Sequence, residues 1–269
     1  MLPWWLLLPL GGYLVGLHGS LQHEAVHGHP TPWRAVNEAL VFPSLWLWMP
    51  YRRYRALHIR HHATPHLTDP IDDPESYYLT AEDWQRKGAI GRALLRVHNT
   101  VTGRLLLGPI FAALSYWRSD LALALNGERG LARPWLLHLI GAALVLVWTL
   151  VVCGLPLIDY ILLFAYPGMS LTLLRSFLEH QAHREAGQRT VIVEAGPVFS
   201  FLFLNNNLHA LHHAAPDMPW YDLPGAFKRH RAQLLAANGG YRYSGYGEII
   251  ARYLFRPKET PAHDAALAK

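Results

Sequence analysis

The sequence predicts an all-α integral membrane protein, with membrane-spanning and shorter interfacial helices beside a cytosolic, histidine-rich cap. Three observations support this fold class. Hydrophobic residues make up 51% of the 269 positions and charged residues only 16%, whereas a soluble domain is about 25% charged. Two long stretches contain no Lys or Arg, and many of the 17 histidines gather in short clusters. The ten Trp and thirteen Tyr are typical of proteins whose rings lie at membrane–water interfaces.

The first predicted span covers about residues 2–22. Residues 1–22 carry no charged side chain, and a helix of that length reaches roughly 33 Å, enough to cross a bilayer. A cleaved signal peptide would begin with basic residues and end at a small-residue cleavage site. The sequence shows neither feature, so we expect a retained helix.

Residues 135–174 predict two further spans joined by a short turn. Asp159 is the single charged residue of this stretch. The turn-forming residues at 153–156, Cys-Gly-Leu-Pro, divide it into 135–153 and 156–174. Each part is long enough to cross a bilayer as a helix. The sequence therefore predicts a helical hairpin with a very short outer turn.

The cationic residues indicate the orientation of these spans. All 24 Lys and Arg residues lie in 34–133 and 175–269. Because positive charge is retained on the cytoplasmic side, both segments are expected in the cytosol of a multi-pass protein, as in the bacterial inner membrane. Residues 39–51 and 105–117 are apolar but too short to span, which predicts interfacial or re-entrant helices. The net charge of +5 then suits anionic headgroups, and no nucleic-acid partner is expected.

No repeat or linker divides the chain, so we expect one membrane domain over residues 1–258 and a flexible tail at 259–269. Cys153 is the single cysteine, which excludes an internal disulfide and a cysteine-held iron–sulfur cluster.

Histidine clusters carry the functional signal. The first is a pair four positions apart, and two later clusters have the spacing HxxHH. On a helix these spacings place the imidazoles on one face. A further candidate follows the second hairpin helix. The nine histidines are His23 and His27, then His58, His61 and His62, then His180, and finally His209, His212 and His213.

All of these clusters fall just inside the predicted cytosolic boundary, so side chains about 150 positions apart are expected at one membrane depth. A lone HxxxH pair is more often incidental than a site. Several clusters at one depth indicate metal ligands. A single zinc ion needs about four ligands, so nine histidines suit two ions. Nitrogen-rich sites accept iron, copper or zinc, and ligand type alone leaves the metal open.

The three boxes, in this order, resemble those of the membrane fatty acid desaturase superfamily, which includes lipid hydroxylases and carotenoid ketolases. The sequences after box two, Asp69–Ser76, and after box three, Pro219–Pro224, are similar as well. His180 lies where related enzymes supply one more ligand. The resemblance covers the chain from its first helix to about Pro224. It implies that the nine histidines hold two iron ions, although family members usually have two spans before box one and here one is visible.

The resemblance implies a membrane non-haem di-iron oxidoreductase that uses O2 to introduce a double bond into a fatty acyl or related lipid chain. Lipid hydroxylation and carotenoid ketolation are the alternatives, because the position of the substrate relative to iron decides the product. Each turnover needs two electrons from outside, so a separate ferredoxin-type or cytochrome-type donor is implied. Five basic residues are candidates for docking an acidic donor: Arg52, Arg53, Arg55, Arg86 and Lys87. The general excess of positive charge at a cytoplasmic face is the simpler explanation for them.

Polar residues beside the boxes are candidates to orient imidazoles by hydrogen bonds. They are Glu24, Asp69, Asp72, Asp73 and Glu179. Asn207 is a candidate to hold a water on iron. Loop turns explain the Asp-Pro steps equally well, and a helix cap explains Asn207. No catalytic residue separate from the metal ligands is expected.

Two other functions fit part of the pattern. Residues His23 to His27 read HExxH, in which Glu24 would be the general base of an intramembrane zinc protease. That function leaves both HxxHH clusters unexplained. A metal carrier or sensor would be expected to place its ligands along a transport path or near a soluble tail, not at one depth.

Overall fold

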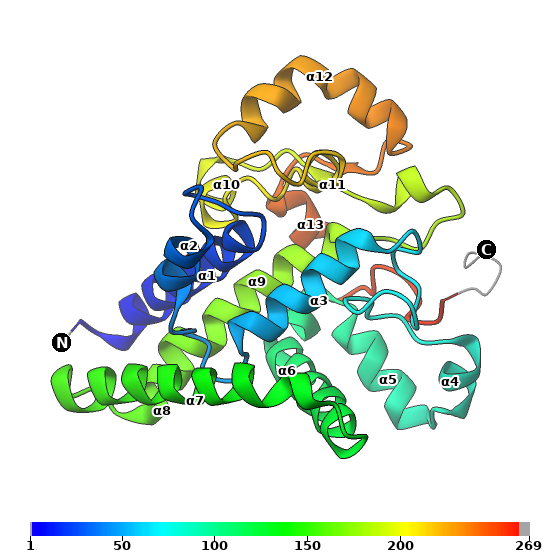
Figure 1. Cartoon of the computed structure of the whole chain (residues 1–269). Helices are drawn as coiled ribbons and strands as arrows, with labels where there is room; N and C mark the ends of the chain where they lie inside the picture. Colours follow the sequence, from blue (N-terminus) through cyan, green and yellow to red (C-terminus); the bar gives the residue numbers. More distant parts are fainter. Residues whose placement is uncertain (1, 264–269) are drawn as a thin grey trace. The chain divides into compact units, whose positions relative to one another are not determined.

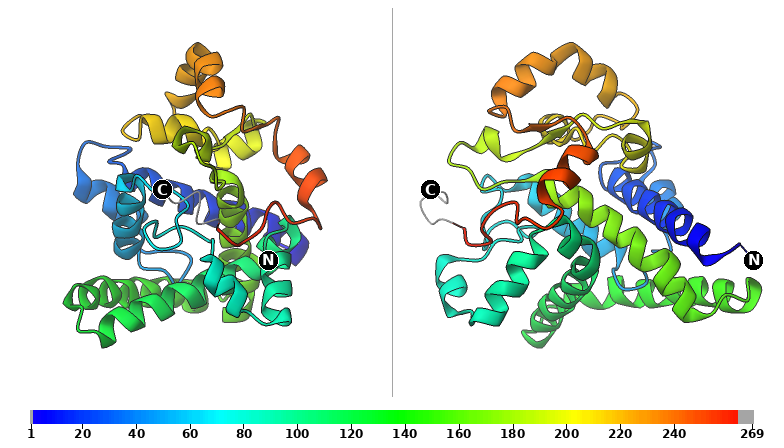
Figure 2. Two further views of the ribbon diagram at one scale, coloured as in Figure 1. Left: turned by 90° about the vertical axis from the view of Figure 1, so that its right-hand side faces the viewer. Right: turned by 180° about the vertical axis from the view of Figure 1, so that it is seen from behind.

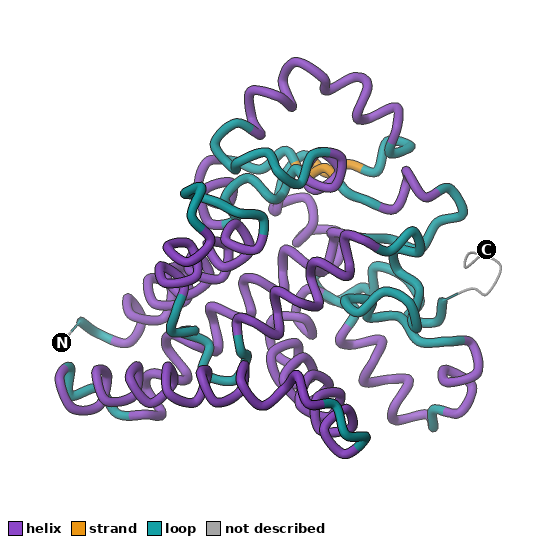
Figure 3. The backbone as a smooth tube through the Cα atoms, viewed as in Figure 1, coloured by secondary structure: helices purple, strands orange, loops and turns teal. Residues whose placement is uncertain are grey.

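The computed structural model describes residues 2–263, and its regular secondary structure is almost entirely helical (Figures 1 and 3). Its strands, β1 (Ile192–Val193) and β2 (Arg242–Tyr243), are two residues each and pair in parallel, with Ile192 opposite Arg242. The helical class predicted from the sequence is confirmed.

The chain divides into two compact units, and each is described by itself. The hairpin unit comprises residues up to 56 together with 107–172, and the histidine unit comprises 57–106 together with the residues from 173 onward. Three helices have residues in both units, namely α3 (Tyr51–Ala63), α6 (Val101–Leu125) and α9 (Tyr166–Glu179). That the units form the one domain expected over residues 1–258 stays a prediction.

The hairpin unit contains the predicted apolar helices. Helix α1 (Trp4–Val26) covers the span predicted at 2–22, and α2 (Arg34–Val41) follows it. The later elements of this unit are a 3-10 turn η1 (Arg129–Leu131), α7 (Ala132–Val147), a π-helical turn η2 (Trp148–Val152), α8 (Leu157–Tyr160), a second π-helical turn η3 (Ile161–Ala165) and the start of α9.

Two helical stretches of the described chain, Arg129–Val152 and Leu157–Glu179, are long and apolar enough to cross a membrane. They contain nearly all of the spans predicted at 135–153 and 156–174. Between them Gly154 has a φ of 62°, in the left-handed region that glycine adopts at no steric cost. The predicted hairpin of helices is therefore present. The membrane crossings and the cytoplasmic face stay predictions, and so does the crossing by α1.

Neither expected short apolar helix has the predicted bounds, and an interfacial or re-entrant position of residues 105–117 stays a prediction. Residues 105–117 are part of α6, a continuous helix of 25 residues. Near the C-terminal end of this helix, the Asp120 carboxylate accepts hydrogen bonds from Arg53 and from the indole of Trp135. Residues 39–51 do not form one helix, since α2 ends at Val41 and α3 begins at Tyr51. Proline at 43 disfavours helical geometry in the residue before it and has no N–H to donate.

The histidine unit carries shorter helices joined by long loops (Figures 1 and 2). Its apolar core includes Ile192 of β1, Leu208, Leu211 and Phe227. The core thus joins the helix that bears the third histidine box to the short sheet. The helical elements are α4 (Ala81–Arg86), α5 (Ala89–His98), η4 (Ala186–Arg189), α10 (Pro197–Leu202), α11 (His209–Ala214), α12 (Leu223–Ala237) and α13 (Tyr246–Tyr253).

Part of the tail expected to be flexible contacts the rest of the histidine unit, and the flexibility expected over 259–269 stays a prediction. Leu79 donates its backbone N–H to Pro261 at 2.8 Å and accepts from the backbone of His263 at 2.8 Å. The His263 side chain is buried. Composition indicated a polar end, but these backbone pairs lie far apart in the sequence. Residues 264–269 lie outside the described part of the chain.

Close helix contacts in the hairpin unit depend on glycine. A Cβ atom at Gly11 of α1 would lie 2.5 Å from the carbonyl oxygen of Leu163, and one at Gly168 would lie 2.6 Å from Val15. Small residues permit this backbone approach, as they do in membrane helix pairs.

We expect Gly11→Ala to lower the free energy of unfolding by about 1–3 kcal/mol, because the added methyl group meets backbone. Gly247→Ala is the control, since no neighbouring atom lies within 4 Å of its Cβ position. Thermal unfolding in detergent would measure both variants. Equal melting temperatures for the two variants would contradict this account.

Candidate metal centre

Seven of the nine predicted ligands belong to the histidine unit, and three separate segments supply them. The second half of α3 carries His58, His61 and His62, and α11 carries His209, His212 and His213. The spacing places each triplet on one face of its helix. His180 follows directly after α9. Two helices and the residue that follows a third helix therefore supply all seven rings.

Four of these histidines form the first ligand set: His61, His180, His209 and His213. One nitrogen from each lies within 4.8 Å of the others. The Nε2 atom of His180 is 3.1 Å from that of His61 and 3.1 Å from that of His209. The Nε2 atoms of His209 and His213 are also 3.1 Å apart.

The second ligand set within this unit is His58, His62 and His212. The Nε2 atom of His62 lies 3.1 Å from that of His58 and 3.2 Å from that of His212. The two sets are adjacent, because the rings of His62 and His213 stack with centroids 4.2 Å apart. Convergent, buried imidazole nitrogens are a donor set suited to a transition-metal ion. Two adjacent sets therefore fit two ions.

Hydrogen bonds to Nδ1 orient three of the rings. Asp73 lies 2.7 Å from Nδ1 of His61, and Glu75 lies 2.9 Å from Nδ1 of His58. The amide oxygen of Asn206 lies 3.0 Å from Nδ1 of His209. Each oxygen can accept the Nδ1 proton, which leaves the Nε2 lone pair available to a metal.

Loop geometry explains why Asp73 and Glu75 occupy these positions. The backbone N–H groups of Thr68 and Glu75 donate to the Asp73 carboxylate, and the Ser76 hydroxyl donates to the carbonyl of Thr68. These bonds close the Asp-Pro-rich loop into a fixed turn. Asp73 therefore both forms the loop turn and orients an imidazole ring, two roles that the sequence left as alternatives.

The other polar candidates have different contacts. Asp69 accepts from the backbone of Ile71 and Asp72 and so forms a loop turn. Asp72 lies 2.8 Å from Nδ1 of His66, which belongs to neither ligand set. The amide of Asn207 donates to the carbonyl of Val193 at 2.7 Å, so it anchors β1. A water-holding role for it stays a prediction.

Glu179 lies 2.7 Å from Arg175, its amide partner is Asn206 at 3.4 Å, and it is 3.6 Å from Nδ1 of His209. It thus orients His209 chiefly through Asn206. The sequence reading missed Asn206 and Glu75. Asn206 precedes the candidate Asn207, and Glu75 lies two positions after the candidate Asp73. This proximity was the only sequence feature that pointed to them.

The first histidine pair lies in the hairpin unit. His23 and His27 are one turn apart near the end of α1, with ring centroids 4.9 Å apart, and Glu24 lies 3.7 Å from Nδ1 of His23. Their part in metal binding stays a prediction. His183 lies just beyond His180 and accepts from the backbone of Glu185, outside both ligand sets.

Burial controls the charge of the ligand rings. It lowers the pKa of His62 to about 3, and it holds the pKa of His180, His209 and His213 well below the ordinary value. Burial acts in the same direction on His61, but the carboxylates of Glu75 and Asp73 outweigh it and raise that pKa to about 9. Most of the rings are therefore neutral at pH 7, the form that binds metal.

Three of the five cationic docking candidates have carboxylate partners within their own units. Arg52 pairs with Glu38, Arg53 with Asp120, and exposed Arg86 with Glu82 and Asp83. Docking of an electron donor on them stays a prediction.

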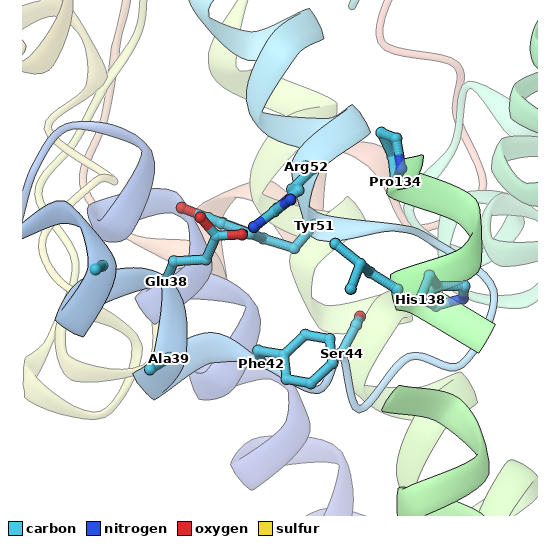
Figure 4. Close-up of a pocket in the computed structure, with 10 residues that line it drawn as sticks. Glu38, Ala39, Phe42, Ser44, Tyr51, Arg52, Pro134 and His138 are labelled. Atoms are coloured by element: carbon cyan, nitrogen blue, oxygen red, sulfur yellow. The ribbon is translucent and has the colours of Figure 1, made fainter. Parts of the chain in front are cut away.

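A pocket of about 290 Å³ in the hairpin unit was not predicted from the sequence. Figure 4 shows Glu38 and Arg52 side by side on one wall, with Phe42 and Ser44 on another. An apolar pocket of about 390 Å³ in the same unit includes Leu14, Leu144 and Trp148 in its lining. Because their linings combine distant segments, no local pattern marks either pocket.

The family model described as fatty acid desaturase matches residues 1–245, most of the chain and all nine candidate ligands. No match is found among curated proteins.

We expect Asp73→Asn to weaken metal binding about 10–100-fold, because the amide is a weaker acceptor for the His61 ring proton. Asp72→Asn is the matched control, since Asp72 contacts His66 outside the ligand sets. Titration of the metal-free protein with Fe2+ or Co2+ would measure this difference. Equal affinities in both variants would count against an orienting role for Asp73.

We expect the melting temperature of the metal-free protein to fall by several degrees from pH 7 to pH 5. His62, His180, His209 and His213 have a lower pKa in the folded state than in the unfolded state. The unfolded chain therefore binds more protons below pH 6.5 and is favoured there. His61 acts oppositely, and its stabilisation is lost as the pH rises through about 9. A melting temperature that rises on acidification would contradict neutral, buried rings.

Proposed function

The chain belongs to the fatty acid desaturase family, and on this premise we propose that it is an O2-dependent, non-haem di-iron oxidoreductase of a membrane. Its proposed reaction introduces a double bond into a fatty acyl or related lipid chain. One observation carries most of this proposal: seven buried or half-buried histidines from three separate segments converge into two adjacent ligand sets.

Each ligand set has a role in the proposal. His61, His180, His209 and His213 would hold one iron, and His58, His62 and His212 would ligate the other. The family resemblance adds His23 and His27 to the ligands. When bound, a pair of reduced irons supplies activation of O2 for removal of hydrogen from an unactivated C–H bond, which no side chain can attack by itself.

The protein's own residues supply orientation and a low-water environment. Asp73 and Glu75 accept ring protons at Nδ1 and so present the Nε2 atoms of His61 and His58. His61, His209 and His212 are at most 2% exposed, so bulk water is excluded from the ligand atoms. Exclusion of water protects reactive species from side reactions.

Several properties favour a lipid substrate reached from a membrane. The two long apolar helices and the low charged fraction support insertion. In this proposal the histidine unit lies on the cytoplasmic face, and a separate ferredoxin-type or cytochrome-type protein delivers the two electrons.

Mass-spectrometric profiling of lipids and pigments in a host that makes the protein with a ferredoxin system tests this proposal. We expect an O2-dependent lipid that has lost two hydrogens, and its formation should fall below detection in the His212→Ala variant. Gain of one oxygen, or a carotenoid ketone, would replace desaturation by hydroxylation or ketolation.

The Glu24→Gln variant separates an oxygenase from the HExxH protease. We expect the variant to retain its irons and to form some product, because the proposed chemistry requires no general base at position 24. Peptide hydrolysis that is lost in Glu24→Gln, without any lipid product in the wild type, would overturn the proposed function.

A further inference from the structure

A segment near the C-terminus packs against two parts of the ligand framework. We call Arg256–His263 the strap, and its eight residues follow the last position matched by the family model, residue 245. The strap forms a parallel bridge between Ala262 and Leu79, at the end of the loop that carries Asp73 and Glu75. The strap is therefore part of the histidine unit, although nothing in the family match assigns it a role.

Lys258 lies at the first anchor of the strap. Its side chain is only 4% exposed, and its ammonium group donates to the carbonyl of His180 at 2.6 Å and to that of Phe177 at 3.2 Å. The carboxylate of Glu259 lies 2.8 Å from the same ammonium. The backbone N–H of Lys258 donates to Asn99 at 2.8 Å, so the main chain is fixed as well.

These bonds complete the C-terminal end of α9. The last carbonyls of a helix have no partner within the helix, and the end carries partial negative charge that a cation stabilises. Tyr241 donates its hydroxyl to the carbonyl of Leu178 at 2.7 Å, and Val191 donates its N–H to that of Glu179 at 3.1 Å. Lys258 donates a hydrogen bond to the carbonyl of Phe177. His180 directly follows Glu179, the last residue of this helix.

His180 differs from the other oriented ligands. His58, His61 and His209 each have an oxygen at Nδ1. Among the described residues, the buried Nδ1 of His180 has no hydrogen-bond partner. Because no hydrogen bond at Nδ1 orients this ring, its direction depends more strongly on how the backbone at residue 180 is held. Lys258 restrains this backbone at the carbonyl of His180, beside the bridge between His180 and Thr190.

The other end of the strap supports the loop that orients His61. The Nε2 atom of buried His263 lies 3.3 Å from the hydroxyl of Thr68. The backbone of Thr68 donates to Asp73 at 2.9 Å, and Asp73 in turn contacts His61. His61 and His180 belong to the same ligand set, with their Nε2 atoms 3.1 Å apart.

We propose that the strap is a positioning element for the first ligand set, in which Lys258 fixes His180 and His263 supports the loop that orients His61. The inference rests on the proposed function, because it assumes that this set holds an ion. It predicts that the two ions depend unequally on Lys258, since its contacts described above involve His180 of the first ligand set and no residue of the second.

Metal release from the full-length protein tests this inference. The variants are Lys258→Met, which removes the cation and keeps most of the stem, and Lys258→Arg, which retains the cation. Lys228→Met is the matched control, because Lys228 is exposed on α12. Release of Fe2+ or Co2+ to a chelator would be followed by absorbance, together with the electronic spectrum of the cobalt-loaded protein.

We expect Lys258→Met to release one of two ions about 10–100-fold faster, with a changed cobalt spectrum for that ion and no change for the other. Lys258→Arg should recover most of the slow release, and Lys228→Met should match the wild type. Equal acceleration of both ions, or release from Lys258→Met at the wild-type rate, would overturn the positioning role.

His263→Phe provides a second test if Lys258→Met does not fold. It keeps a ring against Tyr78, whose centroid lies 5.5 Å away, and removes the contact with Thr68. We expect several-fold faster release of the same single ion, and unchanged release would overturn the inference. A wild-type protein with no more than one ion would overturn the proposed function as well, whereas two ions with strap-independent release would overturn the strap alone.

Discussion

The convergence of seven imidazole rings on one small volume is the constraint on which the histidine unit depends. Burial of so many nitrogen donors is costly unless each finds a partner. Carboxylates and an amide take the Nδ1 side of three rings, and the Nε2 atoms face one another about 3 Å apart. Bound cations would relieve this crowding of lone pairs. The arrangement of nitrogen donors is therefore consistent with two bound metal ions.

Several different segments supply the contacts that support these histidines. The loop after α3 supplies Asp73 and Glu75, the turn before α11 supplies Asn206, and the strap holds the backbone at His180. Each support comes from a different segment, so no single loop movement alters all ligands together. The loop after α3 serves both ligand sets, through Asp73 at His61 and Glu75 at His58, whereas the contacts of Lys258 reach only the first set.

The hairpin unit is built on a different principle. Its helices approach closely at glycine positions, and the two pockets described above are lined largely by apolar side chains. Pairs such as Arg53 with Asp120 neutralise charges within it. Such packing suits an apolar surrounding, in which van der Waals contact and internal hydrogen bonding replace solvation. It is consistent with the membrane setting proposed for the enzyme.

The sequence by itself determined the apolar helices, the hairpin turn and the histidines of the ligand sets, because charge-free length and i, i+3, i+4 spacing are local properties. Only the tertiary structure decided which oxygen serves which ring: Asp73 and Glu75 rather than Asp69, and Asn206 rather than Asn207. The contact of Lys258 with His180 was likewise hidden, since the two residues are far apart in sequence. Hydrogen bonds between distant segments depend on backbone direction, which no local periodicity encodes.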